Sequence, residues 1–359
     1  MIASQAVVHL IDPHGPGASY AAARLAAGVA SADSMIALGI ARDSAAWKPA
    51  WRIPMTAGSV GLAARSLERI VQAAQTRLLV AWGHRACAVA VRAGDSAARV
   101  LVMDAVPKVQ VIPFDAEVIC LGESVANAAM QAGWPPMRVR IAQPPMVDMA
   151  LPDPDGVQRK QLRNTWGLTD SSMAIGVLPN APDEGDSGTA FHVVARVRLT
   201  GIDAHLILHP HTVGAASMEI CARSAGLRHT IHFDQAVRQP EAIASGIDVW
   251  ISIPGKPVDG SVLDPMIAAG LHAPLVVQSG SFAARAVEHG TDGLSAEGLN
   301  RMAAAVRGLC LDPAKRKDLA FAAKVRFATT AKRQAFAGVF AECVQRAAAF
   351  DSKVLAASV

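Results

Sequence analysis

The fold is indicated most clearly by residues 116–148, which read AEVICLGESVANAAMQAGWPPMRVRIAQPPMVD. Their first seven residues are largely apolar and predict a short buried strand. A helical pattern follows over residues 124–132, with Ser124 as its expected N-cap. Gly133 stands where a glycine commonly ends a helix. This strand-then-helix order is typical of an α/β protein.

The composition changes directly after this unit. Residues 144–156 read PPMVDMALPDPDG, a proline- and aspartate-rich stretch of the kind that separates domains. A chain of 359 residues also exceeds what one hydrophobic core usually serves. We therefore expect an N-terminal domain over residues 1–147 and a C-terminal domain over residues 148–330.

Both halves alternate short apolar runs with longer, alanine-rich helical patterns. The strands expected in the first half cover residues 5–12, 34–40, 51–55, 77–83, 98–106 and 116–122. Those expected in the second half cover residues 172–179, 204–211, 229–234, 248–255 and 274–280. Such alternation predicts βαβ units, and hence an α/β fold with parallel sheets. From residue 312 the chain is expected to be helical and basic.

The overall composition is that of a globular protein. Hydrophobic residues make up 52% of the chain and charged residues 18%, which excludes general disorder. The five cysteines form no CxxC pair, so neither a disulfide framework nor a zinc site is expected. With no basic leader and no run of about 18 uncharged apolar residues, the sequence predicts a cytoplasmic protein without a transmembrane helix.

The formal net charge of +4 is compatible with an anionic ligand or an anionic membrane surface, and no nucleic-acid partner is expected. Part of this charge lies near the C-terminal end, at Lys315, Arg316, Lys317, Lys324, Arg326, Lys332 and Arg333. A solvated helix face is one interpretation of this stretch. Weak peripheral docking to anionic lipid of the inner membrane is the other.

Four segments in order, residues 9–26, 77–94, 116–148 and 263–294, resemble the family-4 (group 1) retaining glycosyltransferases. The resemblance implies a GT-B-like fold, in which two Rossmann-like, doubly wound parallel-sheet domains face each other across a cleft. It implies a nucleotide-sugar held mostly by the C-terminal domain, no metal, and a final helix over residues 331–359 that crosses back to the N-terminal domain.

In the N-terminal domain, the resemblance places site residues after two strands. Gly15 and Gly17 follow the first strand, where backbone N–H groups can approach a phosphate, although a tight strand-to-helix turn is the alternative. Trp82 stands where the family often has a histidine that touches the transferred sugar, and His84 follows two residues later. His84 is therefore a catalytic candidate. Trp82 either stacks on a sugar ring or is a half-buried residue at a strand end.

In the C-terminal domain, the resemblance points to residues 255–270, GKPVDGSVLDPMIAAG. The family has two glutamates here, one for the sugar and one for the ribose. The acids of this chain make Asp259 a catalytic candidate and Asp264 a ribose-binding candidate. Gly260 and Ser261 would present backbone N–H groups to a phosphate. Alternatively, Asp259 is a turn residue and Asp264 an exposed acid at a helix start.

His209 and His211 flank Pro210 at the end of a strand, where the family usually has Gly-x-Gly. Two histidines at this spacing suggest a metal pair, but no third ligand of suitable spacing is evident. We therefore expect His209 to contact the nucleotide-sugar.

The chain departs from the family in the cations that offset the leaving diphosphate. Retaining enzymes of this type carry an Arg and a Lys after the first strand of the C-terminal domain. Here residues 178–191, LPNAPDEGDSGTAF, hold only acids, namely Asp183, Glu184 and Asp186. The nearest cations along the chain are Arg196 and Arg198.

Three functions therefore stay open. The first is transfer of a sugar, with retention, from a nucleotide-sugar to an unknown acceptor. The second is a catalytically inactive GT-B-like protein that serves as a binding or partner subunit, and the third is another sugar-nucleotide enzyme such as an epimerase. A transferase needs a cation at the diphosphate, for which Arg196, Lys256 and Arg285 are the candidates, whereas a site lined by Asp183 and Glu184 would favour the second.

Overall fold

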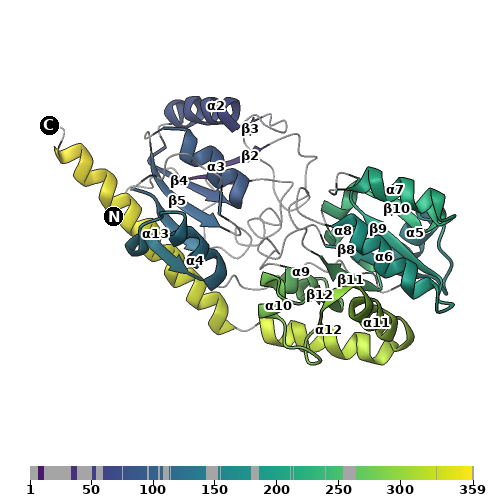
Figure 1. The fold of residues 1–359 in the computed structure, drawn as a ribbon. Helices are drawn as coiled ribbons and strands as arrows, with labels where there is room; N and C mark the ends of the chain where they lie inside the picture. Colours follow the sequence, from purple (N-terminus) through teal and green to yellow (C-terminus); the bar gives the residue numbers. More distant parts are fainter. Residues whose placement is uncertain are drawn as a thin grey trace. The chain divides into compact units, whose positions relative to one another are not determined.

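The protein, a computed structural model, divides into two compact units that are described separately (Figure 1). Unit 1 comprises Met1–Pro144 and Thr330–Val359, and unit 2 comprises Pro145–Thr329. The structure describes residues 7–11, 34–38, 51–53, 60–74, 76–94, 97–103, 106–107, 113, 115–142, 153, 155–178, 186–210, 212, 214–238, 240–253, 264–328 and 330–357.

Unit 1 is built on a parallel sheet whose described strands lie in the order β3-β2-β1-β4-β5-β6-β7. The chain starts in the middle of the sheet, extends to one edge, and then returns to extend to the other, which is a doubly wound topology. The strands are β1 (Val7–Ile11), β2 (Ser34–Leu38), β3 (Trp51–Ile53), β4 (Leu78–Trp82), β5 (Ala98–Met103), β6 (Glu117–Cys120) and β7 (Val139–Ile141).

The described helices of unit 1 that precede residue 144 are α2 (Val60–Ala73), α3 (His84–Arg92), α4 (Glu123–Gln131) and the 3₁₀ turn η1 (Pro136–Arg138). Helix α4 ends as expected, because Gly133 has a φ of 99° directly after the C-cap. Its start differs from the prediction. The N-cap is Gly122 rather than Ser124, since β6 ends at Cys120 and the chain turns into the helix at once.

The last helix, α13 (Thr330–Ala357), packs on β5 and β6 of unit 1, and Figure 1 shows it as the long yellow helix. Phe336 and Phe340 of this helix are buried, and Phe340 stacks on Trp82 with ring centroids 5.7 Å apart. Arg346 lies 3.4 Å from the fully buried carboxylate of Glu117 in β6. Aromatic packing and a buried charge pair thus attach the C-terminal helix to the N-terminal sheet.

Unit 2 contains a second parallel sheet, with described strands in the order β10-β9-β8-β11-β12-β13. Counted from its own first strand, this is the 3-2-1-4-5-6 order of a dinucleotide-binding domain. The strands are β8 (Met173–Val177), β9 (Ala204–Leu208), β10 (Ile231–Phe233), β11 (Val249–Ser252), β12 (Leu275–Gln278) and β13 (Leu294–Ala296). Both sheets are doubly wound, so the predicted fold class is confirmed.

Helices connect these strands and cover the sheet. The α-helices are α5 (Val157–Thr165), α6 (Ser187–Arg198), α7 (Ala215–Ser224), α8 (Pro240–Ile243), α9 (Asp264–Gly270), α10 (Phe282–Ala286), α11 (Gly298–Leu311) and α12 (Pro313–Phe327). The 3₁₀ turns are η2 (Arg228–Thr230), η3 (Gln235–Arg238) and η4 (Ala244–Gly246). The stretch after residue 312, expected to be helical and basic, forms α12 in unit 2 and α13 in unit 1. The final helix expected over residues 331–359 corresponds to α13, which begins at Thr330.

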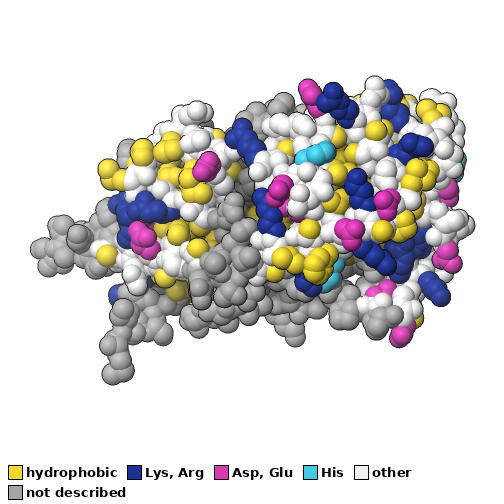
Figure 2. All heavy atoms as spheres, turned by 90° about the horizontal axis from the view of Figure 1, so that it is seen from below, with side chains coloured by type: hydrophobic (Ala, Val, Ile, Leu, Met, Phe, Trp, Pro, Cys, Tyr) yellow, Lys and Arg dark blue, Asp and Glu magenta, His cyan; other side chains and the backbone are white. Residues whose placement is uncertain are grey.

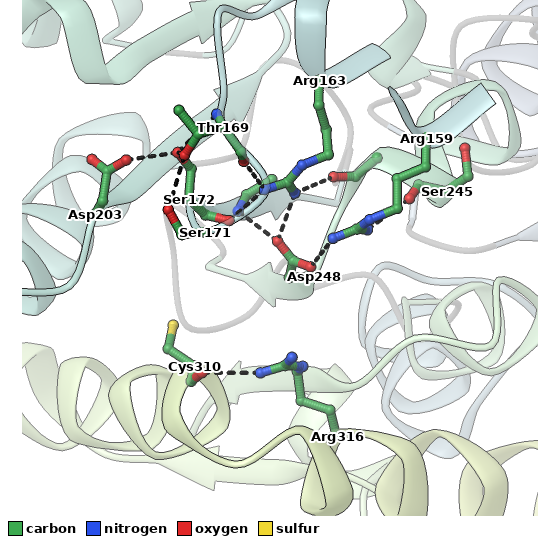
Figure 3. A network of polar contacts seen from close by, with 12 residues as sticks. Arg159, Arg163, Thr169, Ser171, Ser172, Asp203, Ser245, Asp248, Cys310 and Arg316 are labelled. Carbon is green, nitrogen blue, oxygen red and sulfur yellow. Dashed lines mark hydrogen bonds and ion pairs between the residues drawn. The ribbon is translucent and has the colours of Figure 1, made fainter. Parts of the chain in front are cut away.

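A buried ion-pair network holds the amino ends of β8 and β11 together (Figure 3). Asp248, directly before β11, accepts hydrogen bonds from Arg159 at 2.6 Å and from Arg163 at 3.0 Å, both on α5. Its Oδ2 also accepts from the backbone N–H of Ala174 in β8 at 2.8 Å. One carboxylate therefore fixes a helix and the two central strands of unit 2.

Close packing of β8 against β11 makes Gly176 a sensitive position. A Cβ there would lie 2.5 Å from the ring of Trp250, whose side chain is fully buried. We expect Gly176→Ala to lower the free energy of unfolding by about 1–3 kcal/mol, because the tryptophan has no room to move. Gly308→Ala, in open space on α11, should instead raise it by about 0.5–1 kcal/mol. Urea titration of both variants measures the difference, and an equal effect would contradict the packing described here.

Candidate functional site

The topology of unit 2 places its candidate site at the carboxyl edge of the sheet, around β8 and β11. These neighbouring strands are where the strand order reverses, since β9 and β10 extend to one side and β12 and β13 to the other. In open α/β sheets, ligands bind outside the carboxyl ends of the strands at this switch point.

Asp264 is brought to this edge as the first residue of α9. Its side chain is fully buried, and the hydroxyl of Ser252, the last residue of β11, donates to its Oδ2 at 2.5 Å. The alternative of an exposed acid at a helix start is therefore wrong. The sequence could not show this burial, because it depends on how α9 packs under the strand end.

Two helix N-termini lie beside Asp264 on the same edge. Asp186 caps α6, accepting from the backbone N–H of Thr189 at 2.9 Å, and its own N–H donates to the carbonyl of Ile253 at 3.1 Å. Gly214, the N-cap of α7, has a φ of 77° and approaches Ser187 so closely that a Cβ would lie 3.1 Å from its hydroxyl oxygen. The N-termini of α6 and α7 are thus adjacent, and since the Asp186 carboxylate already caps α6, the N-terminus of α7 is the one that suits an anion.

His209 follows β9 directly, at the same carboxyl edge as Ser252 and Asp264. It is buried, and its backbone carbonyl accepts from the N–H of Thr212 at 3.0 Å and from the hydroxyl of Thr212 at 2.7 Å. Two of the sequence-predicted binding residues, Asp264 and His209, therefore lie at the carboxyl ends of strands in one sheet.

Several other predicted residues, in unit 1 and in unit 2, lie outside the described part of the chain. They are Gly15, Gly17, Asp183, Glu184, His211, Lys256, Asp259, Gly260 and Ser261.

The three described candidate cations lie on two different helices, α6 and α10. Arg196 and Arg198 occupy the last turn of α6, at the far end of the helix from the carboxyl edge. Arg196 binds the side chain of Asn300, and Arg198 donates to Asp203 at 2.7 Å. Arg198 is thus paired at the amino edge and Arg196 is bound to α11, and both lie about three turns from the start of α6, so they do not replace the missing Arg/Lys pair. Arg285 lies on α10, the helix that leaves the carboxyl end of β12, and is exposed.

In unit 1, His84 and Trp82 have different surroundings. His84 is the first residue of α3 and is half-buried, following the strand that pairs with β1 at the switch point of this sheet. Trp82 is 1% exposed, donates from Nε1 to His9 at 3.0 Å and stacks on Phe340. Trp82 is therefore a core residue at the end of β4 and cannot stack on a sugar. The alternative placed it correctly at a strand end but underestimated its burial.

A second polar cluster, which no local sequence pattern indicated, lies at the amino end of β9. His205 Nδ1 and His232 Nε2 are 3.0 Å apart, and His205 Nε2 lies 3.1 Å from Asp203. Burial is the main reason that the pKa of His232 is lowered to about 4, and it also lowers the pKa of His205. Burial would raise the pKa of Asp203, but hydrogen bonds from Ser172 and Arg198 outweigh it and lower that pKa to about 2.

This cluster predicts an acid-sensitive unit 2. Unfolding frees His232 to take up a proton between its ordinary pKa of 6.5 and its folded pKa of about 4. The free energy of unfolding should therefore fall as the pH drops through this window. We expect His232→Gln to make the slope shallower and His192→Gln, at an exposed position on α6, to leave it unchanged. Urea titrations at several pH values measure both slopes, and a parent-like slope in His232→Gln would refute the assignment.

Among the described residues, no helix is both long and apolar enough to pass through a bilayer. No three or more His, Cys, Asp or Glu side chains of the described segments gather so that they could hold a metal ion.

The chain resembles known proteins in its fold but not in its sequence. No protein-family profile matches the sequence, and no curated protein matches it. Solved structures do match. WaaG, a glycosyltransferase involved in lipopolysaccharide biosynthesis, superposes with a TM-score of 0.66 at 12% identity, covering 94% of this chain and 99% of that one. Anabaena HepE, in complex with UDP and glucose, gives 0.65 at 15% identity with the same coverages.

A third similar structure, assigned to a UDP-N-acetylglucosamine 2-epimerase of Listeria monocytogenes, has a TM-score of 0.58 at 12% identity, covering 95% of this chain and 98% of that one. At such identities the likeness concerns the fold. With two doubly wound parallel sheets and near-complete coverage of glycosyltransferase structures, the chain has the GT-B fold.

Proposed function

We propose that the protein is a glycosyltransferase that moves a sugar from a nucleotide-sugar to an acceptor, with the nucleotide bound at the carboxyl edge of unit 2. The observation that carries this proposal is the buried Ser252–Asp264 pair at the switch point of the sheet. HepE, with the same fold, has been solved with UDP-glucose. That structure supports a nucleotide-sugar as the donor.

Asp264 would bind the ribose. Ser252 holds Oδ2 and so orients the carboxylate, and a carboxylate oxygen can accept more than one hydrogen bond. A ribose hydroxyl could therefore share Asp264 with Ser252. Burial excludes water as a competitor, which strengthens a charge-assisted hydrogen bond at this position.

The diphosphate would lie at the N-terminus of α7, whose N-cap, Gly214, has no side chain, because the N-terminus of α6 is already capped by the Asp186 carboxylate. The N–H groups of α7 offer positive charge without any side-chain cation. Arg285, at the carboxyl edge on α10, would supply the full positive charge that the leaving diphosphate needs. Retention at the anomeric carbon, catalytic roles for His84 and Asp259, and charge compensation by side chains rather than a metal follow from the family resemblance.

The runner-up function is a GT-B protein that binds a sugar or nucleotide, or serves as a partner subunit, without transfer. One observation favours it. Residues 178–191 hold no Arg or Lys, and the two nearest cations along the helix, Arg196 and Arg198, are already bound to other side chains. The two functions differ in turnover, because both predict nucleotide binding but only the first predicts consumption of the donor.

The first experiment is calorimetry with UDP, UDP-glucose, GDP and ADP. We expect one nucleotide to bind at micromolar affinity, and Asp264→Asn to weaken it about 10- to 100-fold, since a charge-assisted hydrogen bond contributes about 1.5–3 kcal/mol. Arg285→Ala should weaken UDP but not uridine. Arg301→Ala, at an exposed position on α11, is the matched control and should change neither.

Thermal unfolding of each variant separates loss of binding from loss of folding. No nucleotide binding by a cooperatively folded parent protein would refute the proposal. If the protein binds a nucleotide but neither hydrolyses nor transfers the sugar of any tested donor, the result would favour the non-catalytic binding protein.

We also propose that α12 makes peripheral contact with an anionic membrane. Phe321 and Val325 are 69% and 55% exposed and share one helix face with Lys317, while Lys315 is exposed nearby. Figure 2 views the side on which α12 lies in Figure 1 and shows hydrophobic side chains interspersed with Lys and Arg. Exposed apolar groups among cations suit a surface of anionic lipid.

Flotation with vesicles containing phosphatidylglycerol tests this contact. We expect the parent protein to float with anionic vesicles at low salt and Phe321→Ser to reduce the bound fraction severalfold, because less apolar area is buried. Leu199→Ser, at an equally exposed apolar position on another part of unit 2, should bind as the parent does. Equal loss in both variants, or binding to neutral vesicles alone, would contradict the proposal.

A further inference from the structure

Residues 60–94 of unit 1 carry a concentrated positive charge that the proposed donor site does not use. The segment contains five arginines and one glutamate, with no lysine or aspartate, and so has a net charge of +4. The whole chain also has a net charge of +4, which means that the charges of the remaining residues balance one another. The excess charge of the protein therefore corresponds to one short segment, which forms α2, β4 and α3.

Helix α2 presents part of this charge on a single exposed face. Leu62, Arg65 and Arg69 are exposed, and the helical repeat of about 3.6 residues per turn keeps them within about 60° of one another around the helix. The buried residues of α2 lie on the opposite side of the helix, namely Ala63, Ala64, Leu67 and Val71. The exposed side of α2 thus combines a leucine with two arginines.

Arg92 extends this surface from α3, the helix that packs beside α2 (Figure 1). It is the last residue of α3 and is exposed, and a Cβ on Gly61 would lie 3.8 Å from its Nε. The guanidinium of Arg92 therefore lies beside the first turn of α2, which includes Leu62. We call Leu62, Arg65, Arg69 and Arg92 the arginine face.

The arginine face has no acidic partner within the described part of the chain. No ion pair or hydrogen bond to a described residue engages the side chain of Arg65, Arg69 or Arg92. An exposed arginine of unit 2 shows the contrast, because Arg223 pairs with Glu219, four residues earlier on α7, at 2.8 Å. The N–H donors of the three arginines are therefore available to an external anion.

The charge pattern of α2 opposes helix stability rather than supporting it. Arg65 and Arg69 are four residues apart, and like charges at this spacing destabilise a helix. Glu68, the only acid of α2, is half-buried and lies against the end of α3, where a Cβ on Gly94 would be 3.2 Å from its Oε1. The described contacts of unit 1 thus give these arginines no role in folding.

We propose that the arginine face contacts a bilayer that contains anionic phospholipid, with its three guanidinium groups on lipid phosphates and Leu62 between the headgroups. Guanidinium groups bind phosphate oxygens through paired N–H donors. Leu62 is 65% exposed, and an exposed leucine among arginines suits a surface with an apolar layer beneath its charges. A nucleic acid would offer phosphates but no such layer. The proposal depends neither on the glycosyltransferase function nor on the contact proposed for α12.

The test is flotation of the full chain with vesicles of phosphatidylcholine and phosphatidylglycerol at about 0.1 M salt, where screening limits electrostatic effects to charges within about 10 Å. All proteins carry Phe321→Ser, which weakens the contact proposed for α12. We expect Arg65→Ser with Arg69→Ser to lower the partition coefficient about 25-fold, because each basic side chain near an anionic surface contributes about fivefold. Arg223→Ser with Arg301→Ser removes the same charge from exposed positions of unit 2 and should bind as the Phe321→Ser protein does.

Leu62→Ser separates a bilayer from other polyanions. It should lower vesicle binding severalfold and leave any binding to a DNA duplex unchanged, because only the bilayer has an apolar layer for the leucine. Equal losses in the two arginine pairs, vesicle binding that Leu62→Ser does not weaken, or no vesicle binding by the Phe321→Ser protein would each overturn the proposal. So would arginine-dependent binding to DNA but not to vesicles, which would assign the face to nucleic acid.

Thermal unfolding supplies the second readout. Arg65→Ser with Arg69→Ser should leave the melting temperature unchanged or raised, because both side chains are exposed and a like-charge pair is removed. A fall in the melting temperature would give the two arginines a structural role and would also overturn the proposal.

Discussion

The arrangement of unit 2 depends on the carboxylate of Asp248. It receives Arg159, Arg163 and the backbone N–H of Ala174, while its own N–H donates to the carbonyl of Ala174 at 2.8 Å. These bonds join β8 and β11 at their amino ends and so fix the register of the two strands between which the topology reverses. The alignment of their carboxyl ends, and with it the place of Ser252, follows from this contact. A buried carboxylate is costly unless it is fully paired, and here two guanidinium groups and a backbone amide supply the pairing.

Unit 2 thereby divides its polar chemistry between two edges. Ion pairs that stabilise the fold lie at the amino edge, where Arg198 and His205 surround Asp203. Among the described residues, the carboxyl edge has the N-termini of α6 and α7, the α6 cap Asp186 and the fully buried acid Asp264. This division explains why Arg196 and Arg198 cannot serve a diphosphate although they are close to the right segment in sequence. They lie three turns along α6, at the end that points away from the site.

Much of the fold could be predicted from the sequence, because parallel sheets leave a local signal. Runs such as LLVAW and AHLIL are buried on both faces and so appear as continuous apolar stretches, and the proline-rich segment after Ala142 marks the change of unit. Strand β13 was not predicted from the sequence, because its residues Leu294, Ser295 and Ala296 carry no β-branched side chain. The family resemblance also placed a final helix over residues 331–359 on the N-terminal domain, and α13 begins at Thr330 and packs on β5 and β6.

The site was less predictable, because its properties arise from contacts distant in sequence. Trp82 is buried by Phe340, a residue of the last helix, and Asp248 is neutralised by arginines more than 80 residues earlier. No local pattern encodes either contact. The positions of Asp264 and His209 could be anticipated because carboxyl ends of parallel strands share an edge, but the burial of Asp264 could not.

Two carboxylates close to one another show how environment assigns different roles. Asp248 and Glu241 border the same cavity, and both are largely removed from water. Asp248 has cationic partners and therefore stabilises the folded chain. Glu241 has an oxygen without any partner among the described residues, so its burial opposes folding. The same chemical group therefore stabilises the fold at one position and opposes it at the other, and only the paired carboxylate of Asp248 contributes to the register of β8 and β11.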